Sequence, residues 1–363
     1  MYKRKIAFLI LGMKCGGSER AAASLCNHFA SVGADVTLFV LTGTESFYPL
    51  DSKVNAVFLN SELPSSGSLK RLFGILSRAF MLRKKIKEAH PDVLIGMSCI
   101  MSVYAYFCTF FTKIKAVGTE RSNPYEYMNN PVTTFMRRAG AVLCDGYVHQ
   151  THSAMEFFPK CTHKKSAVIQ NAVFNTAVYD FEVPKVREKT VTTMGRLIPE
   201  KGFDVLIEAF SAVSRELPEY KLVIMGEGPL KENLKNLAKE KGLEDRVIFT
   251  GAVSDAVKRC SESSLFVLSS RSEGMPNALL EAMACGVPCV STDCRMGPSE
   301  LIENEVNGLL VPVDDAEAMA QAMLRILKDK ELSEKLSSNA LKIRETNSLD
   351  SVCKKWLSYL SEL

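Results

Sequence analysis

The stretch at residues 265–291 constrains the fold of this chain more than any other. An apolar run at 265–268 has the character of a buried parallel strand, and a polar loop with glycine and proline follows it. A helix is expected at about 277–285 and a second strand at 288–291. The order strand, loop, helix, strand is typical of an open α/β sheet, in which ligands bind where the strands end. The loop before the helix is therefore the first candidate site.

Two carboxylates in this stretch, Glu273 in the loop and Glu281 on the helix, are separated by seven residues. Gly274 permits a close backbone approach, and Pro276 suits the start of a helix, so nearby N–H groups can bind an anion. The N–H groups in question are those near Met275, Asn277 and Ala278. Amides for a phosphate and carboxylates for hydroxyl groups predict a phosphorylated-sugar site. The alternative is that Glu273 interacts with the helix dipole and Glu281 lies on the surface.

A second loop, after an expected strand at 191–194, carries two cations. Gly195 lets the chain turn, and Arg196 and Lys201 lie on either side of the loop, before a helix expected at 203–217. A guanidinium and an ammonium group close to a helix N-terminus suit a diphosphate. Their fixed charges would stabilise negative charge as it develops on a departing diphosphate.

Two further motifs follow strands in the first half. Gly16 and Gly17 lie between a strand expected at 5–11 and a helix expected at 18–31, where paired glycines form an anion nest or a tight turn. Their spacing is not that of the G-x-G-x-x-G dinucleotide motif. Glu120 and Arg121 end a strand expected at 115–119, and the alternative to a binding role is a local surface ion pair.

Charge is divided unevenly along the chain. Residues 1–185 hold 22 Lys and Arg against 13 Asp and Glu, a net +9, whereas residues 186–363 hold 23 against 28, a net −5. A basic first half predicts an anionic partner, which could be acidic lipid, a diphosphate lipid or nucleic acid. The alternative is a solvated basic surface.

A helix expected at 68–88 is both basic and amphipathic. Its seven cations are Lys70, Arg71, Arg78, Arg83, Lys84, Lys85 and Lys87. Its apolar face carries Leu69, Leu72, Phe73, Leu76 and Phe80. Such a helix can lie on an anionic membrane, or its apolar face can pack on the sheet. We expect its charges, not its apolar face, to contact an anionic membrane surface, and no nucleic acid to bind.

The eleven cysteines and five histidines show no zinc-site spacing, so no metal or other cofactor is expected. Scattered cysteines favour reduced thiols and the cytosol. The apolar run near the N-terminus indicates a first buried strand rather than a signal peptide, and no apolar stretch is long enough to span a membrane. We expect a cytoplasmic protein, peripheral on the inner face of the cell membrane.

The motifs GGSER, ERSNP, SSRSEGMPN and GPSELI, with Glu273 and Glu281 at their spacing, resemble those of family 4 retaining glycosyltransferases. The resemblance implies the GT-B fold, an α/β architecture of two Rossmann-like domains facing each other across a cleft. The implied parts are an acceptor- and membrane-facing domain at 1–185, a nucleotide-sugar domain at 186–345, and a C-terminal helix at 346–363 that returns to the first domain.

Carried over to this chain, the resemblance implies roles for four charged residues. Arg196 and Lys201 would neutralise the departing diphosphate, Glu273 would hold the transferred sugar, and Glu281 would hold the ribose. A histidine that many relatives carry is replaced here by Glu120 and Arg121, as in a subset that uses N-acetylated or lipid-linked sugars. The residues implied to contact substrate are Gly16, Gly17, Glu120, Arg121, Gly195, Arg271, Gly274, Met275, Pro276, Asn277 and Glu281.

The expected reaction is retaining transfer of a hexose or N-acetylhexosamine from a UDP-sugar to a lipid-diphosphate-linked glycan or polysaccharide precursor. UDP-N-acetylgalactosamine is the preferred donor, and the product would have an α linkage. One alternative is a sugar-nucleotide epimerase of GT-B-like fold. Another is an inactive relative that serves as a membrane-bound assembly partner. A dinucleotide dehydrogenase is disfavoured because G-x-G-x-x-G is missing.

Overall fold

A computed structural model describes residues 4–62, 68–126, 128 and 130–363, without the side chains of 68–72. The chain forms two compact units, one of Met1–Phe174 with Leu349–Leu363 and one of Asn175–Ser348. The boundary thus lies before the expected one at 185, because the connecting segment is bonded into the second unit. Arg344 donates hydrogen bonds to the carbonyl oxygens of Val178 (2.7 Å) and Phe181 (3.1 Å).

The first unit contains a seven-stranded sheet in the order β3-β2-β1-β4-β5-β6-β7, and every strand pair is parallel. Its strands are β1 (Lys5–Ile10), β2 (Asp35–Val40), β3 (Val54–Phe58), β4 (Val93–Gly96), β5 (Lys115–Glu120), β6 (Gly146–His149) and β7 (Ser166–Val168). Its α-helices are α1 (Gly17–Ser31), α2 (Ser68–Ala89), α3 (Cys99–Thr109), α4 (Pro131–Leu143), α5 (His152–Glu156) and α14 (Leu349–Ser361), and η1 (Lys160–Lys165) is a 3-10 helix.

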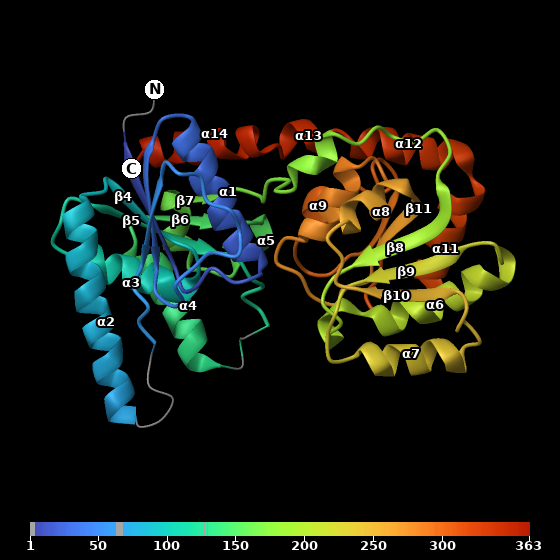
Figure 1. Ribbon diagram of the computed structural model, residues 1–363, viewed down its shortest axis with the longest axis horizontal. Helices are drawn as coiled ribbons and strands as arrows, with labels where there is room; N and C mark the ends of the chain where they lie inside the picture. Colours follow the sequence, from blue (N-terminus) through green and yellow to red (C-terminus); the bar gives the residue numbers. More distant parts are fainter. Residues whose placement is uncertain (1–3, 63–67, 127, 129) are drawn as a thin grey trace. The chain divides into compact units, whose positions relative to one another are not determined.

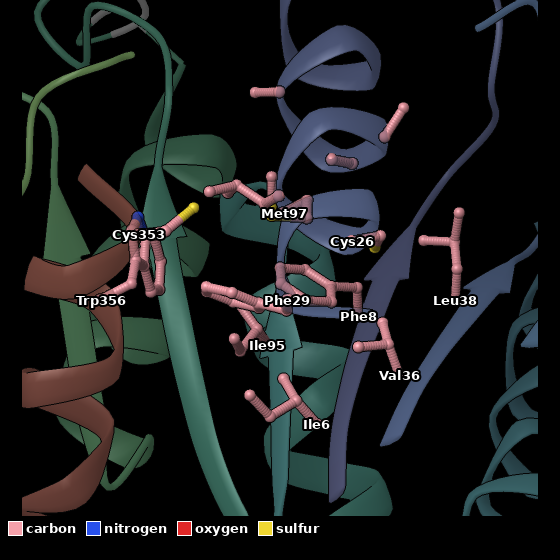
Figure 2. Packing of buried hydrophobic residues seen from close by; sticks show 14 of the residues in the cluster. Ile6, Phe8, Cys26, Phe29, Val36, Leu38, Ile95, Met97, Cys353 and Trp356 are labelled. Atoms are coloured by element: carbon pink, nitrogen blue, oxygen red, sulfur yellow. The ribbon is translucent and has the colours of Figure 1, made fainter. Parts of the chain in front are cut away.

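Helices cover both faces of this sheet. Helices α1 and α14 pack on one face, where Phe29 of α1 and Trp356 of α14 are buried together (Figure 2). On the other face α2 and α3 pack through Leu82, Ile86 and Met101, with α3 between α2 and α4 (Figure 1). The C-terminal helix therefore completes the core of the first unit.

The second unit contains a six-stranded parallel sheet in the order β10-β9-β8-β11-β12-β13. Its strands are β8 (Glu188–Met194), β9 (Lys221–Met225), β10 (Val247–Gly251), β11 (Ser263–Leu268), β12 (Cys289–Thr292) and β13 (Leu309–Val311). Its α-helices are α6 (Phe203–Glu216), α7 (Lys231–Glu240), α8 (Ala256–Glu262), α9 (Asn277–Ala284), α10 (Pro298–Leu301), α11 (Ala316–Lys328), α12 (Lys330–Ala340) and α13 (Ile343–Thr346). Two 3-10 helices, η2 (Thr176–Tyr179) and η3 (Pro199–Lys201), complete it.

The predicted α/β class with two Rossmann-like parallel sheets is confirmed. Strand β3 and helix α4 were not predicted. The sequence of β3, VNAVF, has no continuous apolar run because this edge strand is only partly buried. Helix α4 does carry a readable start signal, since Asn130 caps its first turn and Pro131 begins it. Within the described part of the chain, no helix is long and apolar enough to cross a membrane.

Candidate active site

Two loops of the second unit bring a cation and a carboxylate together. Lys201 ends the segment after β8, and Glu273 lies in the loop after β11; these two strands are neighbours in the sheet. The Nζ atom of Lys201 lies 2.5 Å from Oε1 of Glu273, which also accepts a hydrogen bond from Oγ of Ser270 at 2.6 Å. The Glu273 side chain is 9% exposed and that of Lys201 is 23% exposed. The ion pair is therefore largely shielded from water but reachable by a ligand.

Backbone contacts hold these two loops against each other. Oγ of Ser269 donates to the carbonyl oxygen of Lys201 at 2.8 Å, and the backbone N–H of Arg271 donates to that of Glu200 at 2.8 Å. Gly202 has a φ of +61°, and a Cβ there would lie 2.1 Å from the carbonyl oxygen of Ser269. Only glycine allows this approach, so the position of Lys201 is built into the backbone.

Arg271 lies in the same loop, but its guanidinium is occupied by protein groups. Its Nη atoms form a two-pronged ion pair with Asp204 at 3.0 and 2.7 Å, and its Nε lies 2.6 Å from Asp314. It also donates to the carbonyl oxygen of Pro199 at 2.7 Å. The ion pair with Asp204 lowers the pKa of that carboxyl group, although its partial burial opposes the shift. Arg271 thus ties three segments together, and the structure gives it a holding role.

Arg196 differs from Lys201 in having an exposed side chain. Its guanidinium makes no hydrogen bond or ion pair with any residue that the structure describes. Gly195 precedes it at the end of β8, where its carbonyl oxygen would lie 1.8 Å from a Cβ on Gly226. The tight contact between these glycines fixes the backbone that presents Arg196.

The start of α9 has the uncapped amides that the sequence predicts. Pro276 is the N-cap, one residue before the helix begins, and no side chain caps Asn277–Ala284. Met275 and Pro276 are buried, whereas Gly274 and Asn277 are half-buried. Gly297, at a φ of +95°, brings the β12–α10 turn against this loop, since a Cβ there would lie 2.9 Å from the carbonyl oxygen of Gly274.

The alternative interpretation is wrong for Glu281. Glu281 is only 6% exposed, so it is not a surface residue. Glu273 is paired with Lys201 rather than bonded to the first turn of α9. Whether Glu281 holds a ribose and Glu273 a sugar hydroxyl stays a prediction.

In the first unit, Gly17 begins α1 and Gly16 is its N-cap in an extended conformation. No side chain caps this helix by a hydrogen bond, but the carboxylate of Glu19 folds back over the turn. A Cβ on Gly16 would lie 2.3 Å from Oε2 of Glu19. In this structure the predicted anion nest therefore has an internal carboxylate beside it.

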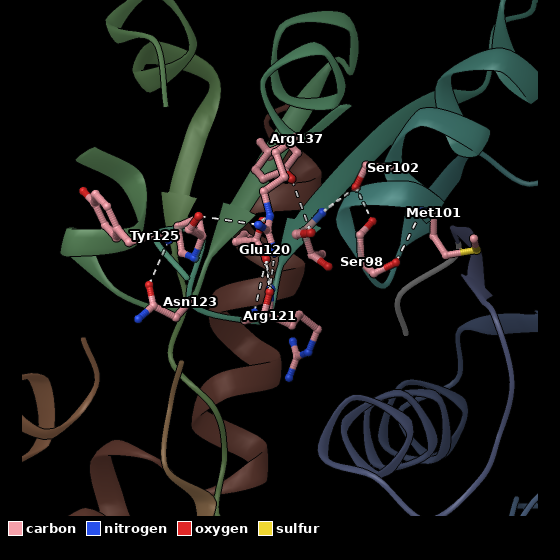
Figure 3. Close-up of polar contacts among 12 residues, drawn as sticks. Ser98, Met101, Ser102, Glu120, Arg121, Asn123, Tyr125 and Arg137 are labelled. Carbon is pink, nitrogen blue, oxygen red and sulfur yellow. Dashed lines mark hydrogen bonds and ion pairs between the residues drawn. The ribbon is translucent and has the colours of Figure 1, made fainter. Parts of the chain in front are cut away.

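Glu120 forms a buried ion pair with Arg137, so the alternative of a local surface ion pair with Arg121 is wrong. Nε of Arg137 lies 2.9 Å from Oε2 of Glu120, and the two side chains are 3% and 2% exposed (Figure 3). Oε1 of Glu120 accepts from the N–H and hydroxyl of Ser122, at 3.2 and 2.8 Å. Burial raises the pKa of Glu120, and the charge of Arg137 opposes that shift. Both carboxylate oxygens are used to hold the loop after β5.

Arg121 points away from that pair (Figure 3). It is half-buried, and its Nη2 donates to Oδ1 of Asn171 at 2.7 Å. Its Nε is buried and has no hydrogen-bond partner among the described residues. Desolvation lowers the pKa of Arg121 to about 10, and the nearby charge of Glu19 opposes this shift. Arg121 and Glu19 thus lie near each other at the carboxyl end of this sheet.

The basic helix α2 is only partly as expected. Arg78 is buried, Arg83 donates to backbone carbonyl oxygens, and Lys85 pairs with Glu88 at 3.0 Å. Lys84 and Lys87 are exposed. The side chains of Leu69, Lys70, Arg71 and Leu72 lie outside the described residues.

The described residues of the apolar face predicted for α2 do not pack on the sheet. Phe73, Leu76 and Phe80 are exposed, and α2 instead packs through Leu82 and Ile86.

His149, at the end of β6, is a buried histidine. It is fully buried, its ring lies 5.0 Å from that of Tyr147 and 4.7 Å from that of Phe158, and neither ring nitrogen has a partner among the described residues. Burial, with a smaller effect of His163, lowers its pKa to about 3. The folded protein therefore keeps this imidazole neutral.

We expect His149→Phe to reduce the acid sensitivity of the first unit. Between pH 6.5 and about 3 the unfolded chain binds a proton at His149 that the folded chain does not, so the unfolding free energy falls as pH falls. The slope is about 1.4 kcal/mol per pH unit. Urea unfolding at several pH values, followed by fluorescence of Trp356, the single Trp of the chain, measures it. Identical pH dependence in variant and wild type would contradict the assignment.

Sequence reasoning did not identify the partners that hold the predicted residues. Arg137, Asp204 and Asp314 come from outside the recognised motifs, whereas Glu19 lies within the motif GGSER. Only Glu19 carried a signal, because it follows Gly16 and Gly17 by one turn. Within the described part of the chain, no group of three or more His, Cys, Asp or Glu side chains could hold a metal ion.

Comparison with known proteins agrees with this geometry. The family described as Glycosyltransferase Family 4 matches residues 15–173, and the family described as Glycosyl transferases group 1 matches residues 178–343. The chain is a family 4 glycosyltransferase. Both units of this glycosyltransferase are thus matched, one by each family, and the prediction of a transferase enzyme is confirmed.

Relatives of this glycosyltransferase match along its whole length. An uncharacterised glycosyltransferase of Haemophilus influenzae is 29% identical over 98% of this chain and 100% of its own. A Campylobacter jejuni enzyme, named as an α-1,4-N-acetyl-D-galactosaminyltransferase acting on a diphospho-undecaprenol-linked glycan, is 26% identical over 99% of each chain. HepE of Anabaena, solved with UDP and glucose, is 18% identical with a TM-score of 0.78 over 99% of this chain and 100% of its own. The predicted GT-B fold is confirmed.

Proposed function

We propose that this enzyme transfers N-acetylgalactosamine, or a related hexose, from its UDP derivative to a lipid-diphosphate-linked glycan, with retention and without a metal ion. The observation that carries the proposal is the shielded pair of Lys201 and Glu273. The free guanidinium of Arg196 lies in the same segment after β8 as Lys201. The Campylobacter relatives named for diphospho-undecaprenol-linked substrates support the choice of acceptor and sugar.

In this proposal the ammonium of Lys201 and the guanidinium of Arg196 neutralise the departing UDP, assisted by the uncapped amides of α9. The bond from the anomeric carbon to the diphosphate oxygen breaks, and the acceptor hydroxyl adds from the same side. Its proton passes to the departing phosphate oxygen. Glu273 and Glu281 hold hydroxyl groups of the sugar and ribose, and no carboxylate acts as a nucleophile.

The first unit receives the acceptor in this proposal. Arg121 at the carboxyl end of β5 and the amides of α1 are the groups available for an acidic acceptor, while Lys84 and Lys87 of α2 face an anionic membrane. The enzyme would then act as a cytoplasmic protein, peripheral on the inner face of the membrane, where a lipid-linked acceptor is found.

The direct test offers the enzyme a panel of UDP-sugars with an undecaprenyl-diphosphate-linked acceptor, in the presence of a metal chelator. We expect an acceptor enlarged by one N-acetylhexosamine, found by mass spectrometry, with an α-anomeric coupling by NMR. A β linkage would overturn retention, and a dependence on added metal would overturn the metal-free leaving group. An epimerised UDP-sugar without transfer would favour the epimerase instead.

A further inference from the structure

Large apolar side chains are exposed mainly on one layer of the first unit. Among the described residues, 20 large apolar side chains are exposed, and 13 of them lie between Phe73 and Leu143, in α2, α3, α4 and their connections. The whole second unit holds four. Single exposed apolar residues are ordinary, whereas such a concentration marks an interaction surface.

The most exposed of these side chains, Phe111, belongs to the turn at 107–111, which we call the aromatic turn. Phe107, Phe110 and Phe111 are 37%, 45% and 90% exposed, and the ring of Phe80 in α2 meets that of Phe107 at 5.8 Å. Phe111 has a φ of +56°, an unfavourable conformation for a residue other than glycine. A large ring is therefore held out in water on a strained backbone.

The aromatic turn is fixed by α2. Nη1 of Arg83 donates to the carbonyl oxygens of Phe107 and Cys108 at 2.8 and 3.0 Å, and its Nη2 donates to that of Phe110 at 2.5 Å. These bonds satisfy carbonyl groups at the C-terminus of α3, and the guanidinium complements the dipole there. The turn that carries the exposed rings is therefore held in place by hydrogen bonds from Arg83.

The charge around this surface is positive. Residues 73–143 hold 10 Lys and Arg against 4 Asp and Glu. Lys84 and Lys87 of α2 share a hollow with Phe80, and Lys113 lies exposed two residues after Phe111. Aromatic rings beside cations fit the headgroup and acyl boundary of an anionic bilayer. A partner with an acidic surface but no apolar phase would leave the rings in water.

We propose that the outer face of α2, α3 and α4 inserts the aromatic turn and Phe80 into an anionic lipid bilayer. This proposal rests on the membrane contact proposed above, but it assigns the binding free energy to a different interaction. Apolar insertion, not charge alone, holds the enzyme on the membrane. Because ring burial is insensitive to salt, part of the binding persists when salt screens the lysines.

The test uses the full chain with phosphatidylcholine vesicles, with and without phosphatidylglycerol. We expect Phe110→Ser with Phe111→Ser to weaken binding to anionic vesicles by about tenfold or more for each ring, at low and at high salt. Lys84→Glu with Lys87→Glu should weaken binding at low salt only. Binding that high salt abolishes, or that the serine variant retains, would overturn insertion.

A second readout does not depend on affinity. The Trp emission of the Phe111→Trp variant should shift to the blue when vesicles are added, and lipids brominated in the acyl chain should quench it. The Phe47→Trp variant carries its Trp at a site that is 65% exposed and outside this layer, and its emission should show neither effect. Trp356 is buried and gives both variants the same background. An unshifted Phe111→Trp, or self-association of the chain that the serine variant abolishes, would overturn the bilayer as occupant.

Failure of this inference is separable from failure of the proposed function. Transfer from UDP-N-acetylgalactosamine to a detergent-solubilised acceptor should be unchanged in the serine variant. Transfer without insertion would overturn the inference and leave the function in place. Insertion without transfer from any UDP-sugar would overturn the proposed function and leave the inference in place.

Discussion

Replacing Lys201 by alanine is expected to lower turnover by about a hundredfold or more while changing donor affinity far less. The reason is that the ammonium group stabilises charge that develops on the diphosphate only as its bond to the sugar breaks. A loss of this size corresponds to about 3 kcal/mol of barrier. Turnover at saturating donor, together with calorimetric binding of UDP, separates the two effects.

The control for this variant is Lys241→Ala. Lys241 lies 2.7 Å from Glu208 in an exposed ion pair of the same unit, so its loss changes the net charge equally without touching the loops that carry Lys201. We expect unchanged turnover. Equal losses of turnover and affinity in Lys201→Ala would instead assign Lys201 to ground-state binding. Glu273→Gln shows whether the ion pair itself matters, because it removes the charge but keeps an acceptor.

The positions of the loops that carry Lys201 and Glu273 could be predicted because parallel strands end at one edge of their sheet. Each residue follows a strand expected to be parallel, so both were expected at the carboxyl edge of the sheet. The structure shows that these strands, β8 and β11, are neighbours. The residues that hold these loops in place could not be predicted. Arg271 is surrounded by Asp204 and Asp314, which are 67 and 43 residues away in sequence. The sequence around Arg271 gives no sign of which distant carboxylates will pair with it.

The packing of the first unit was predicted less accurately because its apolar sequence pattern is weaker. The apolar side chains of α2 suggested a face that packs on the sheet, yet Phe73 and Phe80 are exposed while Leu82 and Ile86 are buried. Helical periodicity shows which residues share a face, but two candidate faces of one helix compete when both are apolar. The sheet contacts that decide between them are a property of the assembled unit.

Removing one partner of the buried pair Glu120–Arg137 is expected to lower the unfolding free energy of the first unit by about 3–5 kcal/mol. Either change leaves an uncompensated group at a site where both side chains are 3% exposed or less. Glu120→Gln and Arg137→Met test the two sides. The double variant should regain much of the loss, because a neutral pair needs no compensating charge. Urea unfolding followed by Trp356, which lies in the same unit, measures all three.

The matched control is Lys5→Met, which removes an exposed pair with Asp35 at 3.7 Å in the same unit and should cost about 1 kcal/mol or less. This series also separates two roles for Glu120. If Glu120 holds the loop after β5, Glu120→Gln loses stability and Arg137→Met loses it equally. If Glu120 instead served only to contact substrate, Glu120→Gln would lose activity at wild-type stability. The latter result would contradict the holding role, because both carboxylate oxygens already accept hydrogen bonds from protein groups.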